Sequence, residues 1–344
     1  MTLDVMELLR RSDPVDPVGI EGWARGEEGR RVLLQIVETS SPVRPPLSRR
    51  RRLAVIPAGA GALALALIVG SMLLPAGRGT ISAEAAVVLR SAARVAGAQP
   101  PVPSDGRYRY TRSEDAYLGT YVERGGSFSV LLPQRREIWV APDGSGRLRE
   151  DESGEPIFLG PRDRSTWEAS GRPALEESGP SDQTFQPGGL YYADLTGYST
   201  DPDELYGQIQ RRAEGPKTSG EPVPEGAPAA VKMFTIVGDL LRETAAPPEL
   251  RAALYEVAAR IPGVILVGEV TDPVGRPGMA VAMASEADGV RRELVFDPET
   301  SELLAERQVL LRRVRWVDAA PGTVIGWAAY LKSGTVDSTS ARPS

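Results

Sequence analysis

The sequence predicts an α+β fold in which helices pack on one face of a mainly antiparallel sheet, preceded by one transmembrane helix. Three observations support this prediction. Residues 53–76 carry no charged side chain. Two series of short strand-like segments flank a helical middle in the rest of the chain. Turn sequences such as Pro142-Asp143-Gly144 join consecutive strand segments, which favours antiparallel hairpins over parallel βαβ units.

The uncharged run at 53–76 is long enough to cross a bilayer. At ~1.5 Å per residue its helix spans roughly 36 Å, against a hydrocarbon core of ~30 Å. Four arginines, Arg49, Arg50, Arg51 and Arg52, directly precede it, whereas Arg78 is alone on the other side. An excess of arginine marks the cytoplasmic side. We therefore expect a signal-anchored, single-pass plasma-membrane protein with a cytoplasmic N-terminus and an extracytoplasmic C-terminal domain.

Two other interpretations of this run are open. A cleaved signal peptide fits less well, because its apolar region has ~7–15 residues and follows a short charged segment. Here about 52 residues precede the run. A buried helix of a soluble domain is disfavoured by Gly59, Gly61 and Gly70, since each glycine weakens a water-exposed helix by about 1 kcal/mol.

Composition excludes several classes of function. The chain has no cysteine and no histidine, so disulfides, Cys/His zinc sites and His-dependent catalytic triads are absent. Residues 1–52 hold ten basic and eight acidic side chains, and residues 77–344 hold thirty and thirty-eight. A net-acidic outer part argues against nucleic acid as a partner. We expect no enzyme activity, no cofactor and no metal.

The inner segment, residues 1–52, is predicted to be a largely disordered cytoplasmic tail with two short amphipathic helices, near residues 3–11 and 27–38. Two such helices are too small for a core of their own. The segment is either an inert tail or a docking segment that folds on a cytoplasmic partner.

The outer segment, residues 77–332, is predicted to be the extracytoplasmic α+β domain, with residues 333–344 as a disordered tail. Residues 153–188 are expected to form a long loop with a short strand at 157–159. Helices are expected at residues 82–98, 201–212, 229–243 and 248–261. Strands are expected at residues 107–113, 116–123, 127–132, 135–140, 145–150, 264–271, 278–284, 290–296, 303–313 and 323–331.

The candidate ligand-binding residues are three tyrosines in a glycine-rich loop before the helical layer: Tyr191, Tyr192 and Tyr198. This loop is either a packed connector or a lid over an apolar cavity. The carboxylates at Asp143, Asp201 and Asp272 precede Pro or Gly, or begin a helix, and are interpreted as turn and capping residues.

Several stretches carry a resemblance to known proteins: REIWVAPDGSGR at 136–147, GGLYYADLTGYSTDPDELYGQI at 188–209 and ELVFDPETSELL at 293–304. With them, the chain resembles uncharacterised single-pass membrane proteins of high-GC Gram-positive bacteria, often encoded beside extracytoplasmic-function sigma factors. The element order is also similar to the half-barrel of lipoprotein carriers such as LolA and of the periplasmic regulator RseB. These resemblances imply a half-barrel-like sheet but no catalytic residue.

Together these features indicate a membrane-anchored extracytoplasmic binding or sensor protein. Its partners would be the plasma membrane, an apolar or lipid ligand, and a cytoplasmic protein such as a sigma factor bound by the inner tail. The alternative is a lipid or lipoprotein chaperone with an inert tail.

Overall fold

The structure is a computed structural model that describes residues 81–100, 107–123, 126–175, 180–189, 195, 197–215, 228–243 and 246–343. The chain divides into two units, Met1–Ala64 and Leu65–Ser344, and all of these residues belong to the second unit. The transmembrane run at 53–76, Arg49 to Arg52 and the inner tail lie outside the described residues, so those predictions stay predictions. No helix among the described residues is long and apolar enough to cross a membrane.

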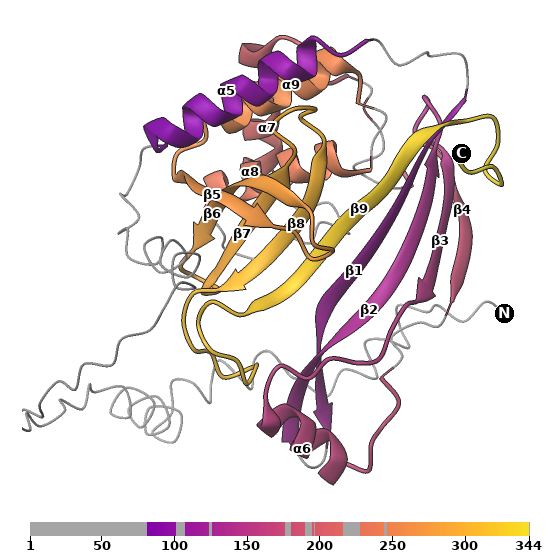
Figure 1. Cartoon of the computed structure of the whole chain (residues 1–344), viewed down its shortest axis with the longest axis vertical. Helices are drawn as coiled ribbons and strands as arrows, with labels where there is room; N and C mark the ends of the chain where they lie inside the picture. Colours follow the sequence, from indigo (N-terminus) through magenta and orange to yellow (C-terminus); the bar gives the residue numbers. More distant parts are fainter. Residues whose placement is uncertain are drawn as a thin grey trace, which may run out of the picture. The chain divides into compact units, whose positions relative to one another are not determined.

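The described part of the second unit contains five helices and nine strands, which confirms the α+β prediction (Figure 1). The helices are α5 (Ala83–Gly97), α6 (Pro161–Ala169), α7 (Pro202–Glu214), α8 (Ala229–Arg242) and α9 (Pro248–Ala258). The strands are β1 (Tyr108–Glu123), β2 (Gly126–Val140), β3 (Gly146–Glu152), β4 (Ser181–Phe185), β5 (Val264–Thr271), β6 (Pro277–Ser285), β7 (Val290–Phe296), β8 (Leu303–Leu310) and β9 (Val324–Val336).

All nine strands form one open antiparallel sheet in the order β4-β3-β2-β1-β9-β8-β7-β6-β5. The first meander, β1 to β4, lies between α5 and α7 in the sequence, and the second, β5 to β9, follows α9. The β1–β9 ladder joins the two meanders, with Asp115 opposite Ala328 and Tyr117 opposite Gly326. The predicted hairpin at Pro142-Asp143-Gly144 connects β2 to β3, with the Asp143 carboxylate accepting from Ser145 N at 2.9 Å.

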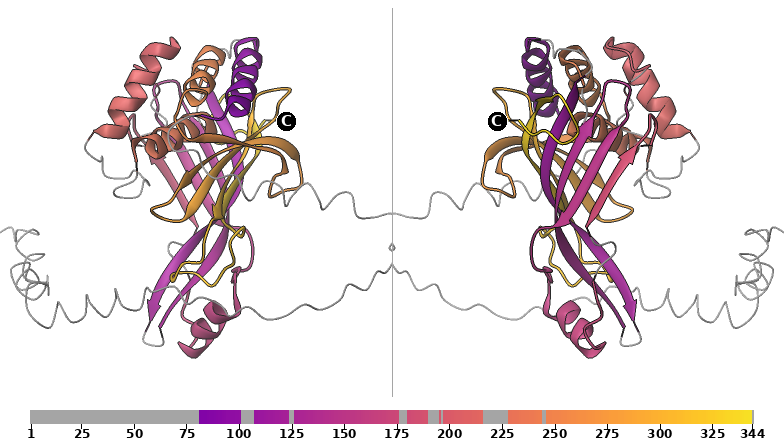
Figure 2. Two further views of the ribbon diagram at one scale, coloured as in Figure 1. Left: turned by 90° about the vertical axis from the view of Figure 1, so that its left-hand side faces the viewer. Right: turned by 90° about the vertical axis from the view of Figure 1, so that its right-hand side faces the viewer.

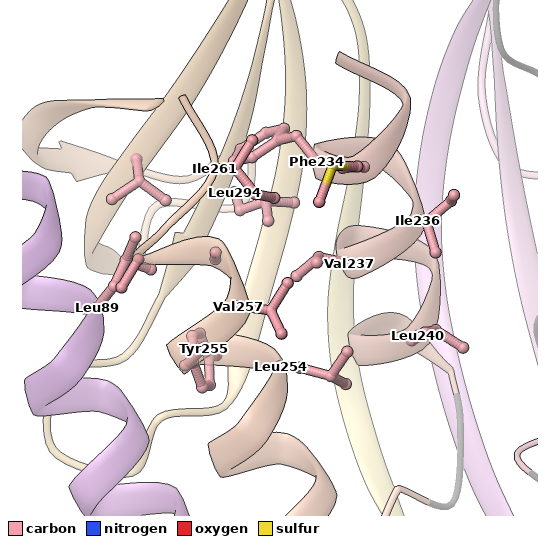
Figure 3. Packing of buried hydrophobic residues seen from close by; sticks show 14 of the residues in the cluster. Leu89, Phe234, Ile236, Val237, Leu240, Leu254, Tyr255, Val257, Ile261 and Leu294 are labelled. Carbon is pink, nitrogen blue, oxygen red and sulfur yellow. The ribbon is translucent and has the colours of Figure 1, made fainter. Parts of the chain in front are cut away.

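Four helices, α5, α7, α8 and α9, gather over one part of the sheet, near β5 to β8, while α6 lies at the far end of the β1–β2 hairpin (Figures 1 and 2). The main apolar core fills the space between these four helices and the sheet. Figure 3 shows Val237 of α8 beside Leu254 and Val257 of α9, whereas Ile236 and Leu240 point to the other side of α8. Apolar side chains at helical spacing supply one layer and alternate residues of the strands supply the other.

The first two strands are longer than the sequence predicts. β1 and β2 are each continuous where a break was expected, and Pro133 lies inside β2. The Pro133 carbonyl accepts a hydrogen bond from Ser153 N at 3.1 Å, just past the end of the β2–β3 ladder. The N–H that proline lacks faces the same side, so no hydrogen bond to β1 is lost.

Two elements lie in the region predicted to be a loop, residues 153–188. Helix α6 begins with Pro161 at its first turn, and its Asp163 is fully buried. The Asp163 carboxylate accepts from Ser129 N at 3.2 Å and from Asp318 N at 2.7 Å, so tertiary hydrogen bonds fix a helix that has little apolar surface. β4 is an edge strand on β3. The expected strand at 157–159 is only a single bridge between Ile157 and Leu131.

The C-terminal segment is a correction to the predicted disordered tail at 333–344. β9 continues to Val336, and the segment after it crosses Trp139 of β2. Trp139 Nε1 donates to the Ala341 carbonyl at 2.7 Å, and the Arg342 guanidinium binds both carboxylate oxygens of Glu137, at 2.5 and 2.7 Å. This contact with Arg342 holds the pKa of Glu137 at about 2. The tail is ordered by partners that are distant in the sequence.

We predict that Leu254→Ala lowers the free energy of unfolding by about 2 to 5 kcal/mol, because Leu254 is fully buried between α9 and α8 and its loss leaves a cavity. Urea unfolding followed by circular dichroism measures this change. Val122→Ala is the control, since Val122 is 83% exposed on β1. An equal effect of the two substitutions would contradict the assigned core.

Candidate functional site

A cavity of about 320 Å³ lies between α8 and the sheet, where the helical layer meets β1, β7, β8 and β9. Side chains alternate between the two faces of a strand, so Ser113, Asp115 and Tyr117 of β1 point to the helical side. Their register partners on β9 are Tyr330, Ala328 and Gly326. The cavity is thus built on the β1–β9 ladder that joins the two meanders.

Small residues leave the space open. Gly326 and Ala328 face Tyr117 and Asp115 across the ladder, so β9 presents almost no side-chain bulk there. On the helix, Gly238 lets α8 approach closely: a Cβ at this position would lie 3.1 Å from Leu294 Cδ2. Phe234 of α8 and Leu294 of β7 give the cavity an apolar side.

Ion pairs line the opposite side of the cavity. The Arg242 guanidinium pairs with Asp239 at 2.5 Å and with Glu306 at 3.0 Å, and Tyr330 Oη donates to Glu306 Oε1 at 2.9 Å. Burial by itself would lower the pKa of Arg242, but Glu306 and Asp239 outweigh it and raise that pKa well above its ordinary value. Arg242 is therefore a fixed cation held by two carboxylates.

A second arginine, Arg136 of β2, also bridges two carboxylates. It contacts Glu150 of β3 at 3.0 Å and Glu243, just after α8, at 3.1 Å. Ser113 Oγ donates to the same Glu243 carboxylate at 3.4 Å. These contacts tie the first meander to the end of α8.

Asp115 differs from its neighbours. Its side chain is 7% exposed and lines the cavity, yet it accepts no hydrogen bond and makes no ion pair with any described residue. Burial raises the pKa of Asp115 to about 7; Arg136 lowers it, and Glu243 and Glu150 raise it. A buried carboxyl without a partner costs folding free energy, so such groups often mark binding sites.

A second cavity, of about 260 Å³, shares Arg242 and Tyr330 with the first. It is more basic, with Arg109, Arg251 and Arg276 in its lining. Arg276 is held by Asp272 at 2.7 Å, and Arg109 donates to Ser333 Oγ at 2.9 Å. Within the residues that the structure describes, no group of three or more carboxylates is placed to hold a metal ion.

Of the three predicted binding tyrosines, the structure describes only Tyr198, and Tyr198 does not line this cavity. Tyr198 packs against the main core, and its hydroxyl accepts a hydrogen bond from Arg212 Nη1, away from the cavity lining. Tyr191 and Tyr192 lie outside the described residues, so their role stays a prediction. Asp143, Asp201 and Asp272 are turn or cap residues, as expected: Asp201, for example, accepts from Asp203 N at 2.9 Å and Glu204 N at 3.0 Å.

Sequence reasoning missed Asp115 because the β1 sequence, YRYTRSEDAY, is polar on both faces. Alternation groups Ser113, Asp115 and Tyr117 on one face but does not say whether helices cover that face. Helix α8 covers this face of β1, and α8 lies more than a hundred residues further along the chain.

No family model matches the chain, and no curated protein matches it. Among solved structures it is similar to a chain in the MucA/MucB complex of Pseudomonas aeruginosa, with 15% identity over 74% of this chain and 58% of that chain and a TM-score of 0.27. A DUF1329 family protein from Desulfovibrio piger is 8% identical over 73% of this chain and 92% of that chain, with a TM-score of 0.18.

A putative outer membrane lipoprotein-sorting protein domain from Vibrio parahaemolyticus is 9% identical over 73% of this chain and 93% of that chain, with a TM-score of 0.19. The chain spans less than two thirds of the length of the MucA/MucB-complex chain that it matches. The membership in a Gram-positive membrane-protein family stays a prediction.

We predict that Asp115→Asn stabilises the protein at pH 8 by about 1 to 3 kcal/mol. The pKa of Asp115 is about 7 in the folded protein, above its ordinary value of 3.8. Between these values the folded protein holds a proton that the unfolded chain has released, so stability is lost as pH rises from about 4 to about 7. Asparagine removes that loss.

Urea unfolding across pH 4 to 8 checks this. The variant and the natural protein should converge near pH 4 and separate toward pH 8. Glu114→Gln, on the opposite face of β1 and in contact with Arg112 at 3.8 Å, is the matched control. Parallel curves for Asp115→Asn and the natural protein would rule out an unpaired buried carboxyl.

Proposed function

We propose that this chain is a membrane-anchored, extracytoplasmic binding protein, without enzyme activity, whose folded domain takes a ligand in the cavity between α8 and the β1–β9 ladder. The observation that carries the proposal is the cavity itself, with an apolar side at Phe234 and Leu294 and a buried, unpartnered carboxyl at Asp115. Its volume lies at the lower end of the range of small-molecule sites, which is ~300–1,000 Å³.

The cavity favours binding over catalysis. General acid–base chemistry needs a titrating group beside a second group that acts on the substrate. Glu243 and Glu150, the carboxylates whose charges act on Asp115, are both engaged with Arg136. A pocket in which the charges are mostly paired and one wall is apolar suits recognition of an amphipathic molecule.

Residues 1–52 would then connect the outer domain to the cytoplasm. Their two predicted amphipathic helices suit a segment that folds on a protein partner, and a sigma factor is our candidate. A lipid or lipoprotein carrier with an inert tail is the second candidate, and the apolar side of the cavity is the observation that favours it. A pull-down with residues 1–52 separates the two: enrichment of a sigma factor supports signalling, and its absence supports the carrier.

We predict that Gly326→Val removes bound ligand from the protein. Gly326 lies in a strand without positive φ, and the atoms nearest to a Cβ there would be in the Gln308 and Tyr117 side chains, at 3.4 Å. Valine is therefore tolerated by β9 and fills the cavity floor. Native mass spectrometry of the full chain, purified from its own host in mild detergent, should show a bound mass that this variant lacks.

The control for this experiment is Gly154→Val, the same substitution at an exposed position outside the strands. It should keep the bound mass. A bound mass that persists in Gly326→Val would place the ligand elsewhere and contradict the proposed site.

We predict that a cysteine at residue 340 is labelled by a membrane-impermeant maleimide in intact cells, whereas one at residue 12 is labelled only after lysis. The chain has no cysteine of its own, so Ser340→Cys and Ser12→Cys each give one defined site. Ser340 is exposed in the structure. The reverse pattern of labelling would overturn the topology inferred from Arg49 to Arg52.

A further inference from the structure

The cavity lining holds four arginines and four carboxylates, and the charges beside Asp115 are unevenly paired. Two arginines, Arg136 of β2 and Arg242 of α8, are each shared between two carboxylates. The carboxylates are Glu150 and Glu243 for the first arginine, and Asp239 and Glu306 for the second. Asp115 adds a fifth carboxyl beside the two arginines. This part of the cavity therefore carries an excess of negative charge.

The other arginines in the lining do not offset this excess. Arg292 pairs with Asp288 at 2.8 Å, and Arg307 pairs with Glu293 at 2.5 Å. Arg291 contacts the same Glu293 carboxylate at 2.6 Å, so Arg307 shares its partner, and both lining arginines are paired. Asp115 is the one charged group in the lining that has no partner among the described residues.

Asp115 is also aimed at open space. It is 7% exposed, and its cross-ladder neighbour Ala328 has no side chain long enough to reach it. Burial raises the pKa of Asp115 to about 7; the nearby charge of Arg136 lowers this pKa, and the like charges of Glu243 and Glu150 raise it. A cation with hydrogen-bond donors is the group that would satisfy such a carboxyl and favour its ionised form.

The surroundings restrict which cation fits. Ca²⁺ and Mg²⁺ take six or more oxygen ligands, and four of the five carboxylates here are engaged with arginine. An ammonium group carries one charge and matches one carboxylate. Phe234, Tyr117 and Tyr330 line the same cavity, so an alkyl chain or the cation itself would meet aromatic rings.

We propose that the cavity binds the ammonium group of an alkylamine, with Asp115 as its counter-ion and the side formed by Phe234 and Leu294 against its alkyl chain. This inference rests on the proposed function, because it names the chemical class of ligand for the same cavity. The ammonium group can belong to a free amine or to the headgroup of an aminolipid such as phosphatidylethanolamine.

The first test compares three probes that share one chain: hexylamine, hexan-1-ol and hexanoate. The full chain in phosphatidylglycerol nanodiscs is titrated with each probe by isothermal calorimetry at pH 7.5. We expect hexylamine to bind about tenfold or more tightly than the alcohol, and hexanoate to bind least. Asp115→Asn should weaken hexylamine binding by about 10- to 100-fold and leave hexan-1-ol binding unchanged. Glu114→Gln should change neither.

The outcomes separate this inference from the proposed function. Equal binding of hexylamine and hexan-1-ol that Gly326→Val abolishes, but Asp115→Asn does not alter, would overturn the ammonium site and keep the cavity as a binding site. Binding of every probe that Gly326→Val leaves unchanged would overturn both. The Asp115→Asn variant is expected to fold, because the substitution removes a buried charge.

The second test distinguishes the two sources of the ammonium group. The natural protein is mixed with vesicles of phosphatidylethanolamine or of its N-acetylated form, re-isolated, and its bound lipid is measured by native mass spectrometry. Retention of the amine-bearing lipid alone supports a lipid headgroup. Hexylamine binding without lipid retention supports a free amine. Equal retention of both lipids, together with probe binding that does not discriminate the amine, would overturn the proposal.

Discussion

The antiparallel ladder between β1 and β9 joins two meanders that are separated in the sequence by α7, α8 and α9. Without it the chain would have two small sheets with exposed edges, and the four helices would face only β5 to β9. The ladder also places Asp115 beside Ala328 and, one strand further, Glu306 beside Ala328. One pairing therefore builds both the continuous sheet and the polar row that lines the cavity.

The helical layer covers only part of this sheet, and the chemistry of the cavity follows from that boundary. Under the helices the inward residues are apolar, as Phe296 and Leu294 show. Toward β1 and β2 the inward residues become ionisable, and α8 ends there with Asp239, Arg242 and Glu243. Arg136 and Arg242 are each shared by two carboxylates, because the end of α8 and the strands that face it both carry acidic residues there. The unpartnered carboxyl of Asp115 is the result of this crowding.

Local signals in the sequence were sufficient to predict most helices and strands. Apolar spacing in α8 and α9, the Asp201-Pro202 start of α7 and the Pro142-Asp143-Gly144 turn each specify their element within a few residues. The elements that the sequence did not predict correctly share one cause. Pro133 inside β2, the polar helix α6 and the tail around Arg342 all depend on partners that are distant in the chain, such as Ser153, Asp318 and Glu137.

The sequence by itself determined the α+β class, the antiparallel pairing and the absence of cysteine and histidine chemistry, because periodicity, turns and composition are local properties. The tertiary structure alone decided which face of β1 is covered and which side chains meet across the cavity. The alternation that groups Ser113, Asp115 and Tyr117 on one face of β1 is the same whether that face is exposed to water or buried. Only the packing of α8 against the β1–β9 ladder removes water from Asp115 and turns an ordinary surface carboxylate into the centre of a candidate site.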